Sequence, residues 1–166
     1  MTVTIHRVGP ERFADIRELR LAALRDSPAA FSSTLERERA FPDDLWRSRL
    51  APEANPHFVA EDSEEGLVGL VVGAVDPDDA DLAWLLSMWV APSRRGSGLV
   101  DELIAVIDSW ARATGRSKLK LEVIADNEPA RRAYLRHGFT PTGRVTRAAG
   151  ERDEVEMERQ AGEPSA

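Results

Sequence analysis

The sequence predicts an α/β fold, in which helices flank one mixed β-sheet within a single domain. Two observations support this prediction. Segments patterned like strands alternate with segments of helical periodicity along the chain. The 166 residues, 42% of them hydrophobic, are enough for one core. Because no repeat or long linker divides the chain, we expect one domain over residues 1–160 and a frayed tail over residues 161–166.

The first third of the chain predicts a strand followed by two helices. Alternating polar and apolar side chains indicate a strand over residues 2–8. Apolar side chains at helical spacing indicate a helix over residues 11–25, which an Asp-Ser-Pro sequence ends. Residues 29–41 mix charges and hydroxyl groups and fit no single element. A Pro-Asp-Asp sequence at 42–44 starts a second helix, which we expect to end near Leu50.

Three strands are expected in the middle of the chain. Residues 57–61 and 67–75 are separated by a polar turn at 62–66, as in a hairpin. A second polar turn at 76–80 leads to residues 82–90. This last segment is almost continuously apolar, so we expect a central strand that is buried on both faces.

A long amphipathic helix and a strand follow. Gly115 ends the helix, because glycine favours the left-handed conformation beyond a helix terminus. Residues 118–124 alternate as a strand. The apolar face of the helix comprises Leu99, Leu103, Val106, Ile107 and Trp110.

The chain closes with a helix and two strands. Asn127 is a favourable N-cap, and a proline in the first turn supports a helix start there. Gly138 ends this helix. Residues 139–146 and 153–158 are the expected final strands.

Composition excludes several classes of function. There is no cysteine, which rules out disulfides, thiolate metal sites and a cysteine nucleophile. The three histidines are far apart without metal-ligand spacing, so we expect no metal. The net charge of −7 disfavours nucleic acid and suits either a cationic substrate or simple solubility. Without a membrane-length apolar run or a signal-peptide layout, a cytoplasmic protein is expected, with no membrane partner.

A glycine-containing loop lies between an apolar strand and the long helix. It comprises Arg94, Arg95, Gly96, Ser97 and Gly98. Unpaired N–H groups and the positive end of the helix dipole favour an anion at such a place, and arginines add charge. The pattern is neither the dinucleotide-binding fingerprint nor a Walker loop. A phosphate-binding loop and a tight turn without a ligand are both open at this point.

Two motifs together resemble the Gcn5-related N-acetyltransferase family. Arg95, Gly98 and Val100 match the Gln/Arg-x-x-Gly-x-Gly/Ala pattern of its acetyl-coenzyme A loop, except that Val100 replaces a small residue. The second motif has Asn127, Ala130 and Tyr134 ahead of a Gly-Phe pair. The resemblance implies a twisted sheet whose central parallel strands splay apart. It also implies a bound coenzyme A whose affinity Val100 brings into question.

The resemblance also implies which residues bind the cofactor. The pantetheine arm would lie along the strand before the loop, with the phosphates over the loop. The expected cofactor-binding residues are Met88, Trp89, Val90, Arg94, Arg95, Gly96, Ser97, Gly98, Leu99, Val100, Asn127, Ala130 and Tyr134.

Acetyl transfer needs a neutral amine, stabilisation of an oxyanion and protonation of the leaving thiolate. By resemblance, Tyr134 is the general acid and Glu122 is a candidate base in a direct-attack mechanism. A backbone N–H at residues 88–90 would stabilise the oxyanion. The structural alternatives are a half-buried tyrosine that packs the helix on the sheet and a solvated glutamate that pairs with Lys120 or an arginine. A base acting through water stays open.

The acceptor side is less defined. The family places it near residues 31–41, Trp46, Trp84, Ser87 and residues 142–152. Of these, Phe31, Trp84 and Ser87 are the expected substrate-binding residues, although a tryptophan is more often core. Small-molecule and peptidyl amines are both open as acceptors. A homodimer paired through a final strand such as 153–158 is also open. So is a second function, a non-catalytic coenzyme A-binding sensor or interaction module of the same fold. Val100 favours this second function.

Overall fold

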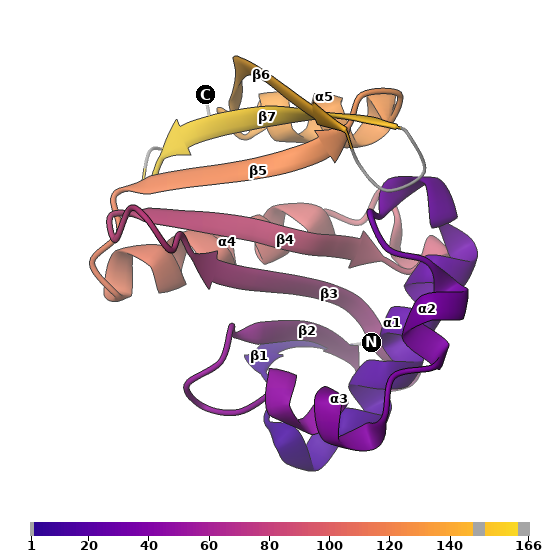
Figure 1. The fold of residues 1–166 in the computed structure, drawn as a ribbon. Coiled ribbons are helices and arrows are strands. Elements are labelled where there is room, and N and C mark those ends of the chain that lie inside the picture. The colour runs from indigo at the N-terminus through magenta and orange to yellow at the C-terminus, as the bar shows by residue number, and fades with distance from the viewer. Residues whose placement is uncertain (1, 148–151, 163–166) are drawn as a thin grey trace.

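The computed structural model describes residues 2–147 and 152–162. Its elements alternate as predicted, with seven strands and five α-helices in one α/β unit (Figure 1). The strands are β1 (Val3–Arg7), β2 (His57–Asp62), β3 (Gly66–Val75), β4 (Leu82–Val90), β5 (Lys118–Ile124), β6 (Thr140–Arg147) and β7 (Asp153–Gln160). The helices are α1 (Phe13–Asp26), α2 (Leu35–Arg39), α3 (Asp43–Arg49), α4 (Leu99–Ala113) and α5 (Glu128–Arg136).

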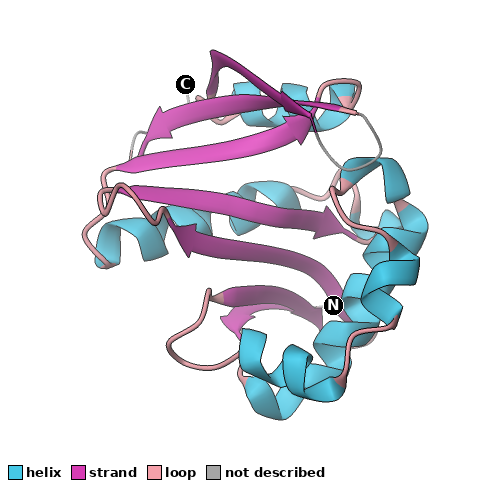
Figure 2. Cartoon of the chain, viewed as in Figure 1, coloured by secondary structure: helices cyan, strands magenta, loops and turns pink. Residues whose placement is uncertain are grey.

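The sheet has the order β1-β2-β3-β4-β5-β7-β6. All neighbouring pairs are antiparallel except β4 and β5, which are parallel. Their pairing covers only Leu82–Trp84 against Lys118–Lys120. Beyond these residues the two strands diverge, as Figures 1 and 2 show. The predicted splay between the central parallel strands is therefore present.

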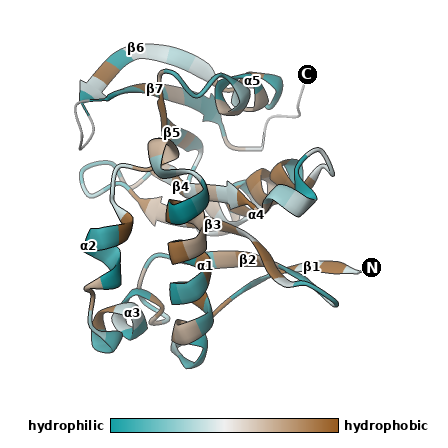
Figure 3. Ribbon diagram, turned by 90° about the vertical axis from the view of Figure 1, so that its right-hand side faces the viewer, coloured by the Kyte–Doolittle hydropathy of each residue, from teal (hydrophilic) through white to brown (hydrophobic). Residues whose placement is uncertain are grey.

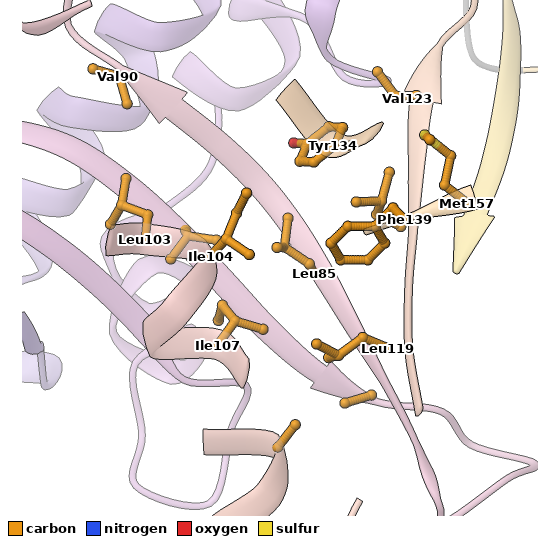
Figure 4. Close-up of a cluster of buried hydrophobic side chains, with 14 of the residues drawn as sticks. Leu85, Val90, Leu103, Ile104, Ile107, Leu119, Val123, Tyr134, Phe139 and Met157 are labelled. Carbon is orange, nitrogen blue, oxygen red and sulfur yellow. The ribbon is translucent and has the colours of Figure 1, made fainter. Parts of the chain in front are cut away.

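Helices cover both faces of the sheet and bury two apolar clusters. On one face α1 packs Ile16 and Leu24 against Val59, Leu70 and neighbouring residues of β2 and β3. On the other face α4 carries the larger cluster, which extends to β5 and α5 (Figure 4). Hydrophobic residues gather on α4 and the central strands, whereas α2 and α5 are mostly hydrophilic (Figure 3). The alternation of hydrophobic and polar residues along the chain thus agrees with the packing of helices on both faces of the sheet.

One burial prediction was wrong. The β4 strand is central, but it is not buried on both faces, because Leu86 is 37% exposed and Trp84, Ser87 and Met88 are partly exposed. These residues border the opening that the divergence of β5 leaves. The undecided residues 29–41 contain a 3-10 turn and the short helix α2, whose N-cap Thr34 accepts a hydrogen bond from the Arg37 amide.

Both edges of residues 153–158, the strand suggested for pairing across a dimer, are occupied within the chain. Strand β7 lies between β5 and β6 and is paired on both edges. The outer strand on this side is β6.

A buried ionic network joins α4 to the end of the chain. Asp108 accepts hydrogen bonds from Arg159 at 2.8 Å, from the Gly162 amide at 2.7 Å and from Arg112 at 3.1 Å. Asp108 and Arg159 are both buried. Ala161 and Gly162, which the tail prediction included, are hydrogen bonded to the domain, whereas residues 163–166 lie outside the described residues.

We expect Asp108→Ala to lower the free energy of unfolding by about 3–5 kcal/mol, because Arg159 would become a buried charge without its partner. Urea unfolding measures the change. The control is Glu102→Gln, an exposed position on the same helix, for which we expect a change within about 0.5 kcal/mol. Equal effects of the two variants would contradict a stabilising role for the network.

Candidate functional site

Two adjoining cavities occupy the opening between β4 and β5. The first, of about 460 Å³, reaches the glycine loop and is lined by Trp89, Val90, Arg95, Val100 and one face of α5. The second, of about 300 Å³, lies on the side of Phe31, Trp84, Ser87, Glu122 and Glu154. Their shared lining residues are Ala30, Met88, Asn127, Ala130 and Tyr134. We call them the loop cavity and the inner cavity.

The glycine loop has the geometry of an anion cradle. Gly96 and Gly98 have φ angles of +77° and +86°, which side chains rarely adopt. A Cβ atom at either position would meet nothing within 4 Å, so the backbone there is open to a ligand. Gly98 is the N-cap of α4, and no side chain caps this helix start. The loop therefore leaves the positive end of α4 available to phosphate groups.

The two arginines of the loop differ in placement. Arg94 bonds to Asp62 at 2.7 Å and Glu65 at 2.8 Å, so its guanidinium anchors the loop to the β2–β3 turn rather than lining the loop cavity. Arg95 does line that cavity. It donates to the Val90 carbonyl and forms an ion pair with Asp26 at the end of α1.

Asp26 was missed by the sequence analysis, which treated it only as a helix stop. It accepts hydrogen bonds from Ser27 at 2.6 Å, from Trp89 Nε1 at 3.1 Å and from Arg95. These bonds, that from Ser27 above all, lower the pKa of Asp26 and keep it charged. The carboxylate thus joins α1, β4 and the loop at the edge of the cavity.

A bulge in β4 shapes the wall of both cavities. Val72 pairs with Leu86 but Leu70 pairs with Trp89, so Ser87 and Met88 together face one residue of β3. Ser87 has a φ of +56°, an unusual value for a residue other than glycine. Met88 lines both cavities, and Ser87 lines the inner one. Beyond Trp84, β5 is no longer paired with β4, so that edge of β4 borders the opening.

Tyr134 lies where the two cavities meet. Its ring packs edge-on against Phe139 at 5.9 Å between centroids, and the residue is only 7% exposed. Figure 4 shows the ring between β4 and β5. Burial raises its pKa, because the phenolate is less well solvated there, so the phenol stays protonated at neutral pH.

Asn127 caps α5 as predicted, since its side chain accepts a hydrogen bond from the Ala130 amide at 3.3 Å. The capped first turn of α5 carries Ala130, which lines both cavities. Three lining residues of the loop cavity on α5 were not predicted: Pro129, Ala133 and Arg136. Their spacing of four and three residues on one helical face is the signal that could have revealed them.

Glu122 lies on the wall of the inner cavity, on the face of β5 opposite the buried Leu121 and Val123. The interpretation as a residue paired with Lys120 does not hold, because Lys120 pairs with Glu156 at 3.1 Å. Glu122 contacts Glu154 of β7 instead, another residue that the sequence analysis missed. Only the register of β5 with β7 brings them together.

The remaining acceptor candidates separate into two groups. Phe31 and Trp84 line the inner cavity, and Asp76 holds the Trp84 indole through Nε1 at 2.8 Å. Trp46, in contrast, is buried in the core against Phe41. Part of the 142–152 segment, residues 148–151, lies outside the described residues.

The described residues contain no group of three or more His, Cys, Asp or Glu side chains placed to hold a metal ion. Within the same residues, no helix is long and apolar enough to cross a membrane. The arrangement can hold a phosphate-bearing arm in the loop cavity and present its far end to a polar inner cavity, with a protonated phenol between them.

Several known proteins are similar to this chain in sequence or in fold. Residues 16–139 match the sequence model of the acetyltransferase (GNAT) family. The uncharacterized N-acetyltransferase YycN of Bacillus subtilis (strain 168) is 31% identical over 81 residues, which cover 48% of this chain. The match spans about half of that relative, 52% of its length.

Solved structures share the whole fold. The structure of yncA from Salmonella typhimurium with its cofactor acetyl-CoA superposes with a TM-score of 0.75 at 21% identity, covering 100% of this chain and 98% of the other. The spermidine N-acetyltransferase from Vibrio cholerae in complex with CoA and spermine gives 0.76 at 20% identity, covering 96% and 95%. Because the family model matches well over half of the residues, the chain belongs to the GNAT acetyltransferase family.

Proposed function

We propose that this protein is an N-acetyltransferase that moves an acetyl group from acetyl-coenzyme A to a primary amine. The observation that carries the proposal is the position of Tyr134, a buried phenol that lines both the loop cavity and the inner cavity. A thioester held in the first cavity and an amine held in the second would meet beside its hydroxyl.

The loop cavity fits coenzyme A. The open backbone at Gly96 and Gly98 and the uncapped start of α4 suit the pyrophosphate, and Arg95 and Arg136 supply positive charge. The free edge of β4 at residues 88–90 suits the amide groups of the pantetheine arm. The bound cofactor would supply the acetyl group as a thioester.

The inner cavity supplies the other parts of the reaction. Glu122 would take a proton from the amine, which must be neutral to attack. A backbone N–H at residues 88–90 would stabilise the oxyanion, and the bulge at Ser87 sets the direction of that segment. Tyr134 would hold its proton for the leaving sulfur. The chain has no cysteine, so a cysteinyl acyl-enzyme is excluded.

A coenzyme A-binding module without turnover is the second candidate. Val100 favours it, because a valine lines the loop cavity where the family pattern has a small residue. The two candidates share the cofactor and differ in the amine reaction, so one measurement of binding and one of turnover separate them.

Thermal unfolding tests the cofactor site. Acetyl-coenzyme A at about 100 times its dissociation constant should stabilise the fold by about 2.7 kcal/mol, which is roughly 5–10 °C in a domain of this size. ATP at the same concentration is the control, because it carries phosphates without the pantetheine arm. Equal shifts with both ligands, or none at millimolar acetyl-coenzyme A, would contradict the proposed cofactor.

Tyr134→Phe tests the acid. We expect kcat for thiol release with amine acceptors to fall about 10²-fold or more, while the thermal shift with acetyl-coenzyme A stays as in the wild type. Phenylalanine keeps the edge-on packing with Phe139 and removes only the hydroxyl. Unchanged turnover would remove Tyr134 from the mechanism, and absence of turnover in the wild type with a broad amine panel would favour the second candidate.

A further inference from the structure

Glu154 extends the inner cavity with a second carboxyl group. Strands β5 and β7 are antiparallel, with Glu122 opposite Glu156 and Ile124 opposite Glu154. Glu154 is therefore the diagonal neighbour of Glu122 on the same face of the sheet. Both side chains line the inner cavity, together with Tyr134 and Ser87. The carboxyl groups of Glu122 and Glu154 form a pair on one wall of the cavity.

The two carboxyl groups lie close enough to interact. Burial raises the pKa of Glu154, and the neighbouring Glu122 carboxyl raises it further, while Arg152 opposes this. Glu154 therefore keeps its proton to a higher pH than an isolated glutamate would. The other charged or titratable side chains around the pair are Arg20, Lys120, Tyr134, Arg152 and Glu156.

Three cations lie near the pair: Lys120 and Arg20 are bonded to other carboxylates, whereas Arg152 donates to the carbonyl groups of Pro28 and Phe31. Lys120 bonds to Oε1 of Glu156, which is 3% exposed and has an Oε2 atom that is buried and makes no hydrogen bond. Arg20 is held by Glu38 through two bonds of 2.9 and 3.0 Å. Its Nη1 atom is buried away from solvent. When both carboxyl groups are ionised, Glu122, Glu154 and Glu156 outnumber Lys120 and Arg152, since Glu38 neutralises Arg20. A ligand that approaches this wall should therefore bring a positive charge.

The opposite part of the cavity is apolar and aromatic. Phe31, Trp84, Leu86 and Met88 line it. The Trp84 indole nitrogen is already bonded to Asp76, so its ring is fixed as a surface for packing. A ligand that satisfies both walls carries an ammonium group on an apolar stem.

We propose that Glu122 and Glu154 together form the ammonium-binding element of the acceptor site, so that the acceptor is a primary amine on an apolar stem which binds in its protonated form. An amine with a carboxylate on the same carbon would be disfavoured, because that carboxylate would face the pair. This inference rests on the proposed acetyl transfer for its catalytic meaning, but the binding itself can be tested separately.

The proton balance is complete. The bound ammonium gives one proton to the Glu122 carboxylate, which leaves a neutral amine and a protonated Glu122. The amine then forms the new C–N bond as the C–S bond of the thioester breaks, and its second proton goes to the sulfur by way of Tyr134. Release of the first proton to water restores the Glu122 carboxylate.

Three matched probes test the binding. n-Butylamine, 1-butanol and norvaline present a similar apolar stem with an ammonium, a hydroxyl, or an ammonium beside a carboxylate. Carbon-13 NMR of the glutamate side-chain carboxyls, recorded with coenzyme A present, reports binding at the pair. We expect n-butylamine to bind at least about tenfold more tightly than either other probe. Equal binding of 1-butanol or norvaline would overturn the inference.

Glu154→Gln keeps the shape and removes the charge. We expect it to weaken n-butylamine about tenfold or more, whereas Glu158→Gln on the same strand should leave binding unchanged. The thermal shift of each variant with acetyl-coenzyme A verifies that the fold and the loop cavity are intact. Wild-type affinity in Glu154→Gln would overturn the inference while leaving the proposed acetyl transfer standing. Conversely, unchanged turnover in Tyr134→Phe would count against the proposed mechanism of acetyl transfer and leave the inference about ammonium binding standing.

The interaction between the two carboxyl groups has its own test. In Glu122→Gln the neighbouring charge is gone, so the pKa of Glu154 should fall toward that of an ordinary glutamate. A pH titration of the Glu154 carboxyl resonance in wild type and variant measures this without any turnover. Identical titration of Glu154 in both proteins would overturn the pairing of the two carboxyl groups.

Discussion

The parallel pairing of β4 with β5 extends over only three residue pairs, and the whole candidate site depends on where it ends. Every other pair of neighbouring strands is antiparallel. After Trp84 and Lys120 the two backbones separate, and backbone groups on the facing edges lose their ladder partners. Such groups are costly to leave unpaired, so this edge is prepared for a ligand with amide groups of its own.

The elements around the opening keep it from collapsing. On one side α4 fills the base with a cluster that includes Leu103, Ile104 and Ile107. On the other, α5 inserts Tyr134, which packs on Phe139 and reaches only part of the way between the strands. The bulge at Ser87 turns β4 away from a regular path at the same level. The result is two adjoining cavities that meet at Tyr134, which suits a reaction between two different substrates.

Charge is arranged differently at the two cavities. The loop cavity has Arg95, Arg136 and a helix start, whereas the inner cavity has two neighbouring glutamates, Glu122 and Glu154. Asp26 and Asp62 each hold one arginine of the loop, so the loop is fixed by carboxylates before any phosphate arrives. This separation of charge suits an anionic ligand in the loop cavity and a cationic ligand in the inner cavity. Part of the net charge of −7 therefore lies at the inner cavity, where it can attract a cation as well as aid solubility.

Local sequence patterns were enough to predict most of the fold. Three features follow from short-range rules on periodicity, capping and glycine: the bounds of β4 and β5, the cap at Asn127 and the left-handed Gly115 after α4. The structure has them as expected. The motif residues Arg95, Gly98 and Tyr134 likewise line or border the cavities at the positions that the sequence suggests.

Contacts between segments that are distant in the sequence could not be predicted from local patterns. Three such contacts join residues 32 to 69 positions apart in the sequence: Arg94 with Asp62, Asp26 with Arg95, and Glu122 with Glu154. The partial exposure of β4 has the same origin, because an apolar run predicts burial but not the strand that fails to cover it. Periodicity specifies which face a side chain occupies on its own element. Strand register and the packing of elements specify what it meets there, and these depend on the whole chain.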